Sequence, residues 1–285
     1  MTSQESFMFN VQAGDAAIPA IGFGTYGVSD AEIHRLLPAA IEAGFRHIDT
    51  AQIYRNEAAI GDCVAASGIA RNEFFLTTKV WVSHYAEAFF EASVNESLRK
   101  LKTDYIDLLL LHWPGSDVPL AEQIAGLNAV VRAGKVRHIG VSNFNRAQMT
   151  EAIRLSAIPL VTNQFEYHPY LNQSLLIDST LEAGLAVTGY CGMAIGRVFA
   201  DPTLKDIAGS HGKTIAQIVL RWLIQQAGVV TLSRTTRIER MASNLAVFDF
   251  ELDGAEMAAI HALATNNSRI VDPPGFAPVW DSTRA

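Results

Sequence analysis

A short unit recurs along this chain and constrains its fold more than any other feature. Each copy is an amphipathic segment, then Ala-Gly, then a short apolar run. The dipeptides are Ala43-Gly44, Ala133-Gly134, Ala183-Gly184 and Ala227-Gly228. A glycine just past a helix end relaxes the left-handed turn there, and runs that are apolar on both faces are typical of parallel strands covered by helices. The unit therefore predicts helices that alternate with buried parallel strands.

The segments between the apolar runs carry helix signals. Thr214 with Gln217 three residues later is a capping-box pattern, which predicts that a helix over 215–226 begins there. Pro38 lies inside the helical pattern of residues 33–41 and is expected to bend or shorten that helix. We expect eight strands, at residues 20–25, 47–51, 74–80, 106–113, 137–143, 160–166, 186–190 and 229–232.

This order of elements predicts an α/β fold, a single (β/α)8 TIM barrel that spans residues 1–285 as one domain. An open doubly wound sheet is the alternative, but no G-x-G-x-x-G follows a first strand. No Pro/Ser-rich linker or shift in composition divides the chain. We also expect a short N-terminal β-hairpin, formed by residues 7–11 and 16–19, and extra helices near the C-terminus.

Composition bounds the class of protein. The net charge of −7 argues against nonspecific binding to nucleic acid or to an anionic membrane. No apolar run approaches the roughly 18 residues of a membrane helix, and the N-terminus lacks the pattern of a signal peptide. The two cysteines form no C-x-x-C pair, and the histidines show no ligand spacing, so no metal site is expected. A cytoplasmic protein is the expectation.

Polar and aromatic residues follow nearly every apolar run. In a (β/α)8 barrel the active site lies at the carboxyl ends of the strands, so these residues are expected to face one another. In chain order they are Asp49 and Tyr54, Lys79, His112, Ser142 and Asn143, Gln164, Tyr190, and then Arg234 and Thr235.

The first four of these residues suit the reduction of a carbonyl group. Hydride attack builds negative charge on the carbonyl oxygen, and a proton donor must meet it. A free tyrosine titrates near pH ~10, so Tyr54 is a poor acid–base group near neutral pH unless its surroundings shift its pKa. The ammonium of Lys79 is expected to lower the pKa of Tyr54, Asp49 to keep Lys79 charged, and His112 to orient the carbonyl or relay the proton.

Taken singly, each residue also has a structural explanation. Tyr54 alone is more often a packed, half-exposed tyrosine, and His112 or Tyr190 alone can belong to a core. Arg234 and Arg240 can lie on a solvated helix face. The functional interpretation depends on their joint occurrence, in order, at matching strand ends.

Several segments of the chain resemble the aldo-keto reductase superfamily. The similarity runs over roughly residues 18–252 in order, and the tail at 269–281 also resembles one branch. The most similar branch is that of the bacterial 2,5-diketo-D-gluconate and methylglyoxal reductases. The segments are Gly44-Phe-Arg-His-Ile-Asp49-Thr-Ala-Gln-Ile-Tyr54, Leu76-Thr-Thr-Lys79-Val, Leu109-Leu-Leu-His112-Trp-Pro, Gly140-Val-Ser-Asn143-Phe and Thr162-Asn-Gln164-Phe-Glu.

The resemblance implies a metal-free reduction in which Tyr54 is the general acid, tuned by Lys79 and Asp49 and assisted by His112. It implies that Ser142, Asn143 and Gln164 hold the nicotinamide carboxamide and that Tyr190 stacks on the ring. It implies further contacts to the cofactor from Thr25, Cys191, Met193, Arg234, Thr235, Arg240 and Asn244.

Two stretches depart from the pattern of the superfamily. After the eighth strand, Arg234 replaces the usual lysine without the usual proline, and Ser243 replaces the glutamate before Asn244. Arginine still offers bidentate contacts to a 2′-phosphate, so NADPH is the expected cofactor and NADH the weaker one. After the seventh strand, Gly192 stands where proline is common, which is expected to loosen that loop.

Aromatic residues near the strand ends either line a substrate pocket or plug the barrel rim. They are Tyr26, Trp81, Trp113 and Trp280. The expected substrates are small aldehydes, 2-oxoaldehydes or keto-sugar acids, reduced by a monomer. Three alternatives remain: an NADP-dependent alcohol or sugar dehydrogenase, a non-catalytic nucleotide-sensing subunit, and an unrelated barrel isomerase.

Overall fold

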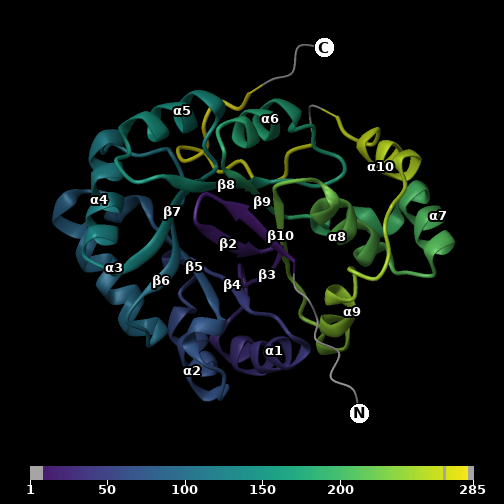
Figure 1. The fold of residues 1–285 in the computed structure, drawn as a ribbon, viewed down its shortest axis with the longest axis horizontal. Helices are drawn as coiled ribbons and strands as arrows, with labels where there is room; N and C mark the ends of the chain where they lie inside the picture. Colours follow the sequence, from purple (N-terminus) through teal and green to yellow (C-terminus); the bar gives the residue numbers. More distant parts are fainter. Residues whose placement is uncertain (1–8, 266–267, 282–285) are drawn as a thin grey trace.

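The computed structural model describes residues 9–265 and 268–281. Eight parallel strands close into a barrel in the order β10-β3-β4-β5-β6-β7-β8-β9, with helices around it (Figure 1). This confirms the (β/α)8 prediction, and the doubly wound alternative is wrong. The strands are β3 (Ile21–Gly24), β4 (His47–Asp49), β5 (Phe75–Val80), β6 (Ile106–Leu111), β7 (Val136–Ser142), β8 (Leu160–Glu166), β9 (Ala186–Tyr190) and β10 (Val229–Ser233).

Within the described residues, seven helices follow the barrel strands and three more lie late in the chain. The first set is α1 (Asp30–Ala43), α2 (Glu57–Ala66), α3 (Glu87–Leu101), α4 (Leu120–Arg132), α5 (Arg146–Leu155), α6 (Ser174–Glu182) and α8 (Ile215–Gln225). The extra helices expected near the C-terminus are α7 (Pro202–His211), α9 (Met241–Leu245) and α10 (Gly254–His261). Across the described ranges, no helix is long and apolar enough to cross a membrane.

The N-terminal hairpin pairs β1 (Asn10–Ala13) with β2 (Ala16–Pro19) in antiparallel register. The second strand is as predicted, but the first extends to Ala13, so the loop predicted at residues 12–15 is too long. The reason is the two-residue turn at Gly14-Asp15, where Gly14 has φ +59, as tight hairpin turns require. The start of the predicted first strand, residues 7 and 8, lies outside the described part of the chain.

The glycines of the recurring unit have the expected left-handed backbone. Gly44, Gly134, Gly184 and Gly228 have φ of 113, 72, 78 and 76°, values that L side chains rarely adopt. Each glycine ends a helix and turns the chain into the next strand, which fixes where the strand ends lie on the opposite side of the barrel.

Two helix predictions had different outcomes. The capping box at Thr214 is present, with Gln217 N donating to Thr214 Oγ1 and Thr214 N donating to Gln217 Oε1. Pro38 does not shorten α1, which continues to Ala43. A proline inside a helix removes one backbone hydrogen bond, but the buried Leu36, Leu37 and Ile41 around it hold this helix against the barrel.

Candidate active site

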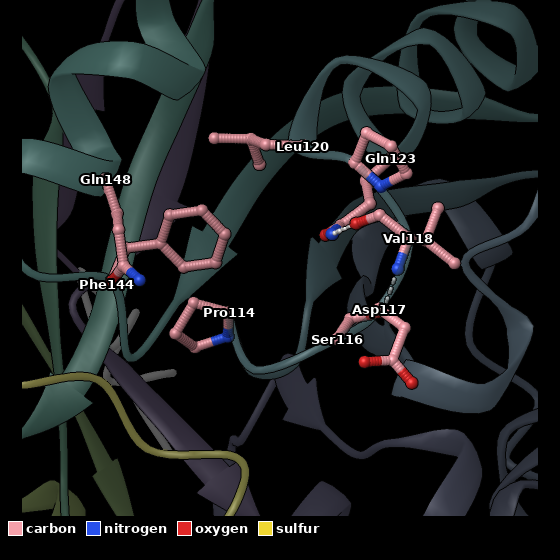
Figure 2. A pocket seen from close by; sticks show the side chains of 9 residues that line it. Pro114, Ser116, Asp117, Val118, Leu120, Gln123, Phe144 and Gln148 are labelled. Atoms are coloured by element: carbon pink, nitrogen blue, oxygen red, sulfur yellow. Dashed lines mark hydrogen bonds between the residues drawn. The ribbon is translucent and has the colours of Figure 1, made fainter.

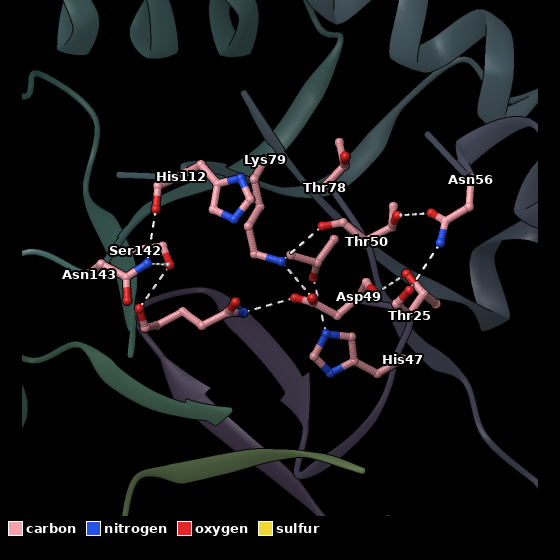
Figure 3. Close-up of polar contacts among 12 residues, drawn as sticks. Thr25, His47, Asp49, Thr50, Asn56, Thr78, Lys79, His112, Ser142 and Asn143 are labelled. Atoms are coloured by element: carbon pink, nitrogen blue, oxygen red, sulfur yellow. Dashed lines mark hydrogen bonds and ion pairs between the residues drawn. The ribbon is translucent and has the colours of Figure 1, made fainter. Parts of the chain in front are cut away.

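A buried ion pair lies at the carboxyl ends of the second and third barrel strands. Lys79 Nζ donates to Asp49 Oδ1 at 2.5 Å and to the carbonyl of Thr50 at 2.9 Å (Figure 3). The exposed fractions of Asp49 and Lys79 are 2% and 1%. Charges removed from water are rarely found without such partners, so the barrel holds this lysine as part of a polar cluster.

Tyr54 and His112 lie beside the ion pair. Tyr54 ends a short 3-10 helix, η1 (Gln52–Tyr54), and its ring centroid is 5.4 Å from Lys79 Nζ. The ring of His112, directly after β6, meets the Tyr54 ring edge-on at 5.6 Å between centroids. The structure therefore brings together all four residues that the sequence places at separate strand ends.

The loop that carries Tyr54 is fixed by a residue that the sequence analysis did not single out. Asn56 is buried, accepts a hydrogen bond from Thr50 Oγ1 and donates to the carbonyls of Thr25 and Val28. It thereby ties the loop after β4 to the loop after β3. An asparagine beside a loop tyrosine is a weak sequence signal, because asparagine is common in loops for local reasons.

The electrostatics of the four residues differ from the expectation in one respect. Burial holds the pKa of Tyr54 well above 10, and the charge of Asp49 and the nearby Tyr26 phenol raise it further. The net lowering that the sequence predicted is therefore wrong for the cofactor-free protein, because burial and the charge of Asp49 set the direction of the shift. Burial lowers the pKa of Lys79, opposed by Asp49. Tyr54 is therefore protonated at neutral pH.

His112 is neutral at neutral pH. Burial, and then the charge of Lys79, bring the pKa of His112 well below 6.5. Its Nδ1 is buried without a hydrogen-bond partner among the described residues. The Trp81 ring packs edge-on against the His112 ring, with 5.3 Å between the ring centroids. A neutral imidazole in this setting can donate one hydrogen bond to a carbonyl oxygen, but it does not act as a general acid.

The three residues expected to hold the nicotinamide carboxamide lie side by side at the ends of β7 and β8. Ser142 Oγ and Asn143 N both donate to the carbonyl of Gln164, at 2.9 and 2.8 Å. Asn143 Nδ2 donates to His112 O and Ser142 Oγ, and its Oδ1 accepts from Tyr190 Oη at 2.7 Å. Asn143 has φ +63, which asparagine tolerates.

The free hydrogen-bonding groups of this set match a primary carboxamide. Both N–H groups of Asn143 Nδ2 are used, and the Ser142 hydroxyl has donated its proton. Gln164 Nε2 donates to Asp49 Oδ2 at 2.8 Å, which leaves one N–H of that amide. The set therefore offers one donor and several acceptor oxygens to a group that has one carbonyl and an NH2. The residues present fit the nicotinamide end of the cofactor.

The residues expected at the adenosine end follow β10. Arg234 and Arg240 are exposed and Thr235 is half-buried. Arg234 Nη2 reaches the carbonyl of Gly27 at 3.4 Å. Asn244 is buried and donates to Ser233 Oγ. Exposed guanidinium groups are free to meet a phosphate, and this end of the site is more open than the nicotinamide end.

Thr25, Cys191 and Met193 lie at the ends of β3 and β9. Thr25 Oγ1 donates to the carbonyl of Asp49, beside the ion pair. Cys191 is half-buried, and burial raises the pKa of its thiol to about 11. Met193 packs partly against the core.

The loop after β9 forms a compact turn, η4 (Ala194–Ala200). A Cβ at Gly192 would approach Leu223 Cδ1 to 3.0 Å, so the glycine here allows close packing against α8.

The aromatic residues around the cluster of Asp49, Tyr54, Lys79 and His112 differ in exposure and in contacts. Tyr26 is 69% exposed and meets the Tyr54 ring edge-on at 5.2 Å. Trp81 lies between His112 and Phe276, 5.2 Å from the latter. Trp113 is buried, and Trp280 stacks on the Arg269 guanidinium at 3.5 Å. The structure thus brings Tyr26 and Trp81 to the cluster, with Trp280 in the tail.

The C-terminal tail is anchored by a residue to which the sequence analysis gave no role. Glu166, fully buried at the end of β8, accepts from the backbone N–H groups of Ile270 and Val271, both at 2.8 Å, and is 2.9 Å from His168 Nε2. Gly115 N donates to Phe276 O at 3.0 Å. The tail therefore runs over the strand ends. The one sequence signal for this position is Glu166, a glutamate at the end of a predicted strand, which needs a partner when it is buried.

A separate hollow lies beyond Pro114, between the loop before α4 and the start of α5 (Figure 2). Its volume is ≈ 300 Å³, and Leu120, Phe144 and Gln123 are among its lining residues. None of the four clustered residues lines it, so this hollow is separate from the cluster of Asp49, Tyr54, Lys79 and His112.

The family model described as the Aldo/keto reductase family matches residues 20–265. The chain belongs to this family, and it is an oxidoreductase that acts on carbonyl groups. The fold and the family define its class.

Individual relatives are similar to this chain over nearly its whole length. Methylglyoxal reductase DkgB from Salmonella typhimurium is 40% identical over 267 residues, which cover 93% of this chain and 99% of the relative. A solved structure provisionally assigned as a 2,5-diketo-D-gluconic acid reductase B has 57% identity and a TM-score of 0.96, covering 97% of this chain and 99% of its own. A Bombyx mori aldo-keto reductase in complex with NADP has 35% identity and a TM-score of 0.87, covering 92% and 94%. The cofactor class is therefore a nicotinamide.

Proposed function

We propose that this protein is an NADPH-dependent reductase of small aldehydes, 2-oxoaldehydes or keto-sugar acids. The observation that carries the proposal is the cluster of Tyr54 and His112 beside the buried Asp49–Lys79 pair at the strand ends. NADPH supplies the hydride, from nicotinamide C4 to the carbonyl carbon.

Tyr54 is the proton donor in this proposal. Its hydroxyl is protonated at neutral pH and gives its proton to the carbonyl oxygen as negative charge develops there. The tyrosinate that forms lies beside the Lys79 ammonium, which stabilises it. The neutral imidazole of His112 donates a hydrogen bond to the same oxygen and fixes its position. Asp49 keeps Lys79 charged and in place.

The cofactor is held at two ends. Ser142, Asn143 and Gln164 bind the carboxamide, and Tyr190 is the platform for the ring. The exposed Arg234 and Arg240 would contact the 2′-phosphate, because guanidinium groups bind phosphate in a bidentate manner. This charge favours NADPH over NADH.

The substrate class is supported by the relatives, whose names include reductases of methylglyoxal and of 2,5-diketo-D-gluconic acid. Tyr26, Trp81 and Phe276 form an aromatic wall near Tyr54 and His112, which suits small, partly apolar carbonyl compounds.

The experiment is a carbonyl screen. Purified protein is mixed with NADPH and a panel that includes methylglyoxal, 2,5-diketo-D-gluconate and simple aldehydes, and nucleotide absorbance is followed. We expect turnover of at least one dicarbonyl, faster with NADPH than with NADH. Initial rates with the alcohols and NADP+ establish the favoured direction. Binding of NADPH without turnover of any carbonyl or alcohol would overturn the proposal.

A further inference from the structure

Gln164 contacts the catalytic ion pair directly, through the same amide that faces the expected carboxamide site. Its Nε2 donates to Asp49 Oδ2 at 2.8 Å, while Asp49 Oδ1 accepts from Lys79 at 2.5 Å. Each oxygen of the Asp49 carboxylate therefore has one side-chain donor. All three side chains are almost fully buried, with exposed fractions of 3% or less.

The strand holds Gln164 in this position. In the barrel register Gln164 pairs with Ser142 of β7 and Thr188 of β9. Its carbonyl accepts from Ser142 Oγ and Asn143 N, so its backbone is fixed on one side by the other carboxamide residues. The amide reaches across the barrel end to Asp49, 115 residues earlier in the chain.

We propose that Gln164 is a positioning residue that couples recognition of the nicotinamide carboxamide to the Asp49–Lys79 ion pair beside Tyr54. One N–H of the Gln164 amide holds Asp49, while its second N–H and its Oε1 remain for the carboxamide. This inference rests on the proposed function and adds to it a second task for Gln164.

The second task matters because the ion pair is out of water. A hydrogen bond to a buried carboxylate stabilises its charged form, and loss of such a donor leaves a desolvated oxygen without a partner. An aspartate that is less stable as an anion takes the proton of its lysine partner more readily. The ammonium that stabilises the Tyr54 oxyanion is then lost. Gln164 thus keeps the pair ionised while it orients the cofactor.

The titratable groups around Asp49 come from several elements. Lys79 faces it from β5, Tyr54 from η1, and His47 from β4 itself, while His112 at the end of β6 faces Lys79. A Gln164→Glu substitution would add a second carboxyl group against Asp49. Two adjacent carboxylates share one proton rather than both ionise, so this variant acquires a titration that the wild type lacks.

The first test uses the cofactor-free protein. Thermal unfolding of Gln164→Glu, of Ser142→Ala and of the wild type is followed as a function of pH. The shared proton raises the carboxyl pKa in the folded state. The stability that Gln164→Glu loses relative to the wild type must therefore increase as the pH rises above the pKa of glutamate in the unfolded chain, about 4.3. Ser142→Ala removes another carboxamide residue without adding a charge, and its deficit should stay constant with pH.

The second test uses turnover at saturating NADPH. Above the shared pKa, kcat/KM of Gln164→Glu for the carbonyl should fall about tenfold per pH unit relative to the wild type. Ser142→Ala should raise KM for NADPH and keep the wild-type pH profile. A Gln164→Glu variant whose stability deficit and pH profile both run parallel to the wild type would overturn the coupling. The proposed function would survive that result, because wild-type turnover tests it separately.

A third variant guards against misfolding of Gln164→Glu. Gln164→Met keeps the volume and removes both amide groups. The coupling predicts that kcat at saturating NADPH falls at least tenfold, in addition to any rise in KM for NADPH. An unchanged kcat with a raised KM alone would mean that Gln164 serves the carboxamide only.

Discussion

At the scale of single residues, the buried Asp49–Lys79 pair makes the clearest prediction for stability, because removal of one partner leaves the other charge buried and unpaired. Lys79→Met would leave the Asp49 carboxylate buried without its counter-charge, which costs on the order of 3–5 kcal/mol of stability. The double variant Lys79→Met/Asp49→Asn removes both charges and should recover a large part of that loss. Urea unfolding of the two single variants and the double variant measures the coupling. Additive losses would contradict a direct pair.

The pH sign of that loss is also predicted. Without Lys79, the folded-state pKa of Asp49 rises above its unfolded value, so the stability deficit of Lys79→Met must grow as the pH rises above about 3.9 and ease as it falls. Unfolding at several pH values checks this, and a deficit that grows towards acid pH would exclude the mechanism.

A second residue-scale prediction concerns activity. The pKa of His112 lies well below 6.5 and that of Tyr54 well above 10, so neither group titrates near neutrality in the cofactor-free protein. For the carbonyl, kcat/KM should therefore be flat between about pH 6 and pH 8 and should fall only where Tyr54 loses its proton. A limb near pH 6.5 that is absent from His112→Asn would contradict the neutral imidazole.

Much of the site could be predicted from residues at strand ends, because a barrel fixes where those ends meet. Asp49, Lys79 and His112 each follow a buried apolar run, and the structure places them together. The contact from Gln164 to Asp49 could not be predicted, since it depends on a side-chain direction across the barrel. Nor could the raised pKa of Tyr54 be predicted, because the sequence shows a nearby lysine but not how far the fold removes the tyrosine from water.

At the scale of elements, close helix packing depends on glycine at one contact. A Cβ at Gly61 in α2 would lie 2.2 Å from the carbonyl oxygen of Lys100 at the end of α3. Gly61→Ala should therefore destabilise the protein by roughly 1–3 kcal/mol through overpacking.

Gly209 in α7 provides the matched control. Nothing lies within 4 Å of an added Cβ there, so Gly209→Ala should stabilise the protein by about 0.5–1 kcal/mol through helix propensity. Chemical denaturation of both variants measures the difference. Equal changes in the free energy of unfolding would show that the close contact between α2 and α3 does not determine the effect of Gly61→Ala.

The same scale shows which elements the sequence could predict. The Ala-Gly units locate helix ends and the strands after them, since left-handed glycines have few other uses at such positions. The turn over Ala194–Ala200 could not be predicted, because Ile195 adopts φ +51 in it. β-Branched residues rarely enter that region, so no local propensity indicates the turn.

At the scale of the whole molecule, we propose that the chain forms one domain that works as a monomer. The closed barrel supports one domain, because each of its strands pairs with two neighbours and the barrel has no open edge. We expect a single unfolding transition, coincident by fluorescence and circular dichroism. Two separated transitions would contradict one domain, and a dimer in sedimentation velocity would contradict the monomer.

In the proposed reaction, Tyr54 donates the proton to the carbonyl oxygen. The most direct measurement is kcat of Tyr54→Phe with NADPH and a dicarbonyl that the wild type reduces, beside a tryptophan-fluorescence titration of NADPH. We expect kcat to fall by roughly 10²–10⁴-fold, the usual contribution of a positioned acid, while the affinity for NADPH is retained. Undiminished turnover by Tyr54→Phe would contradict it.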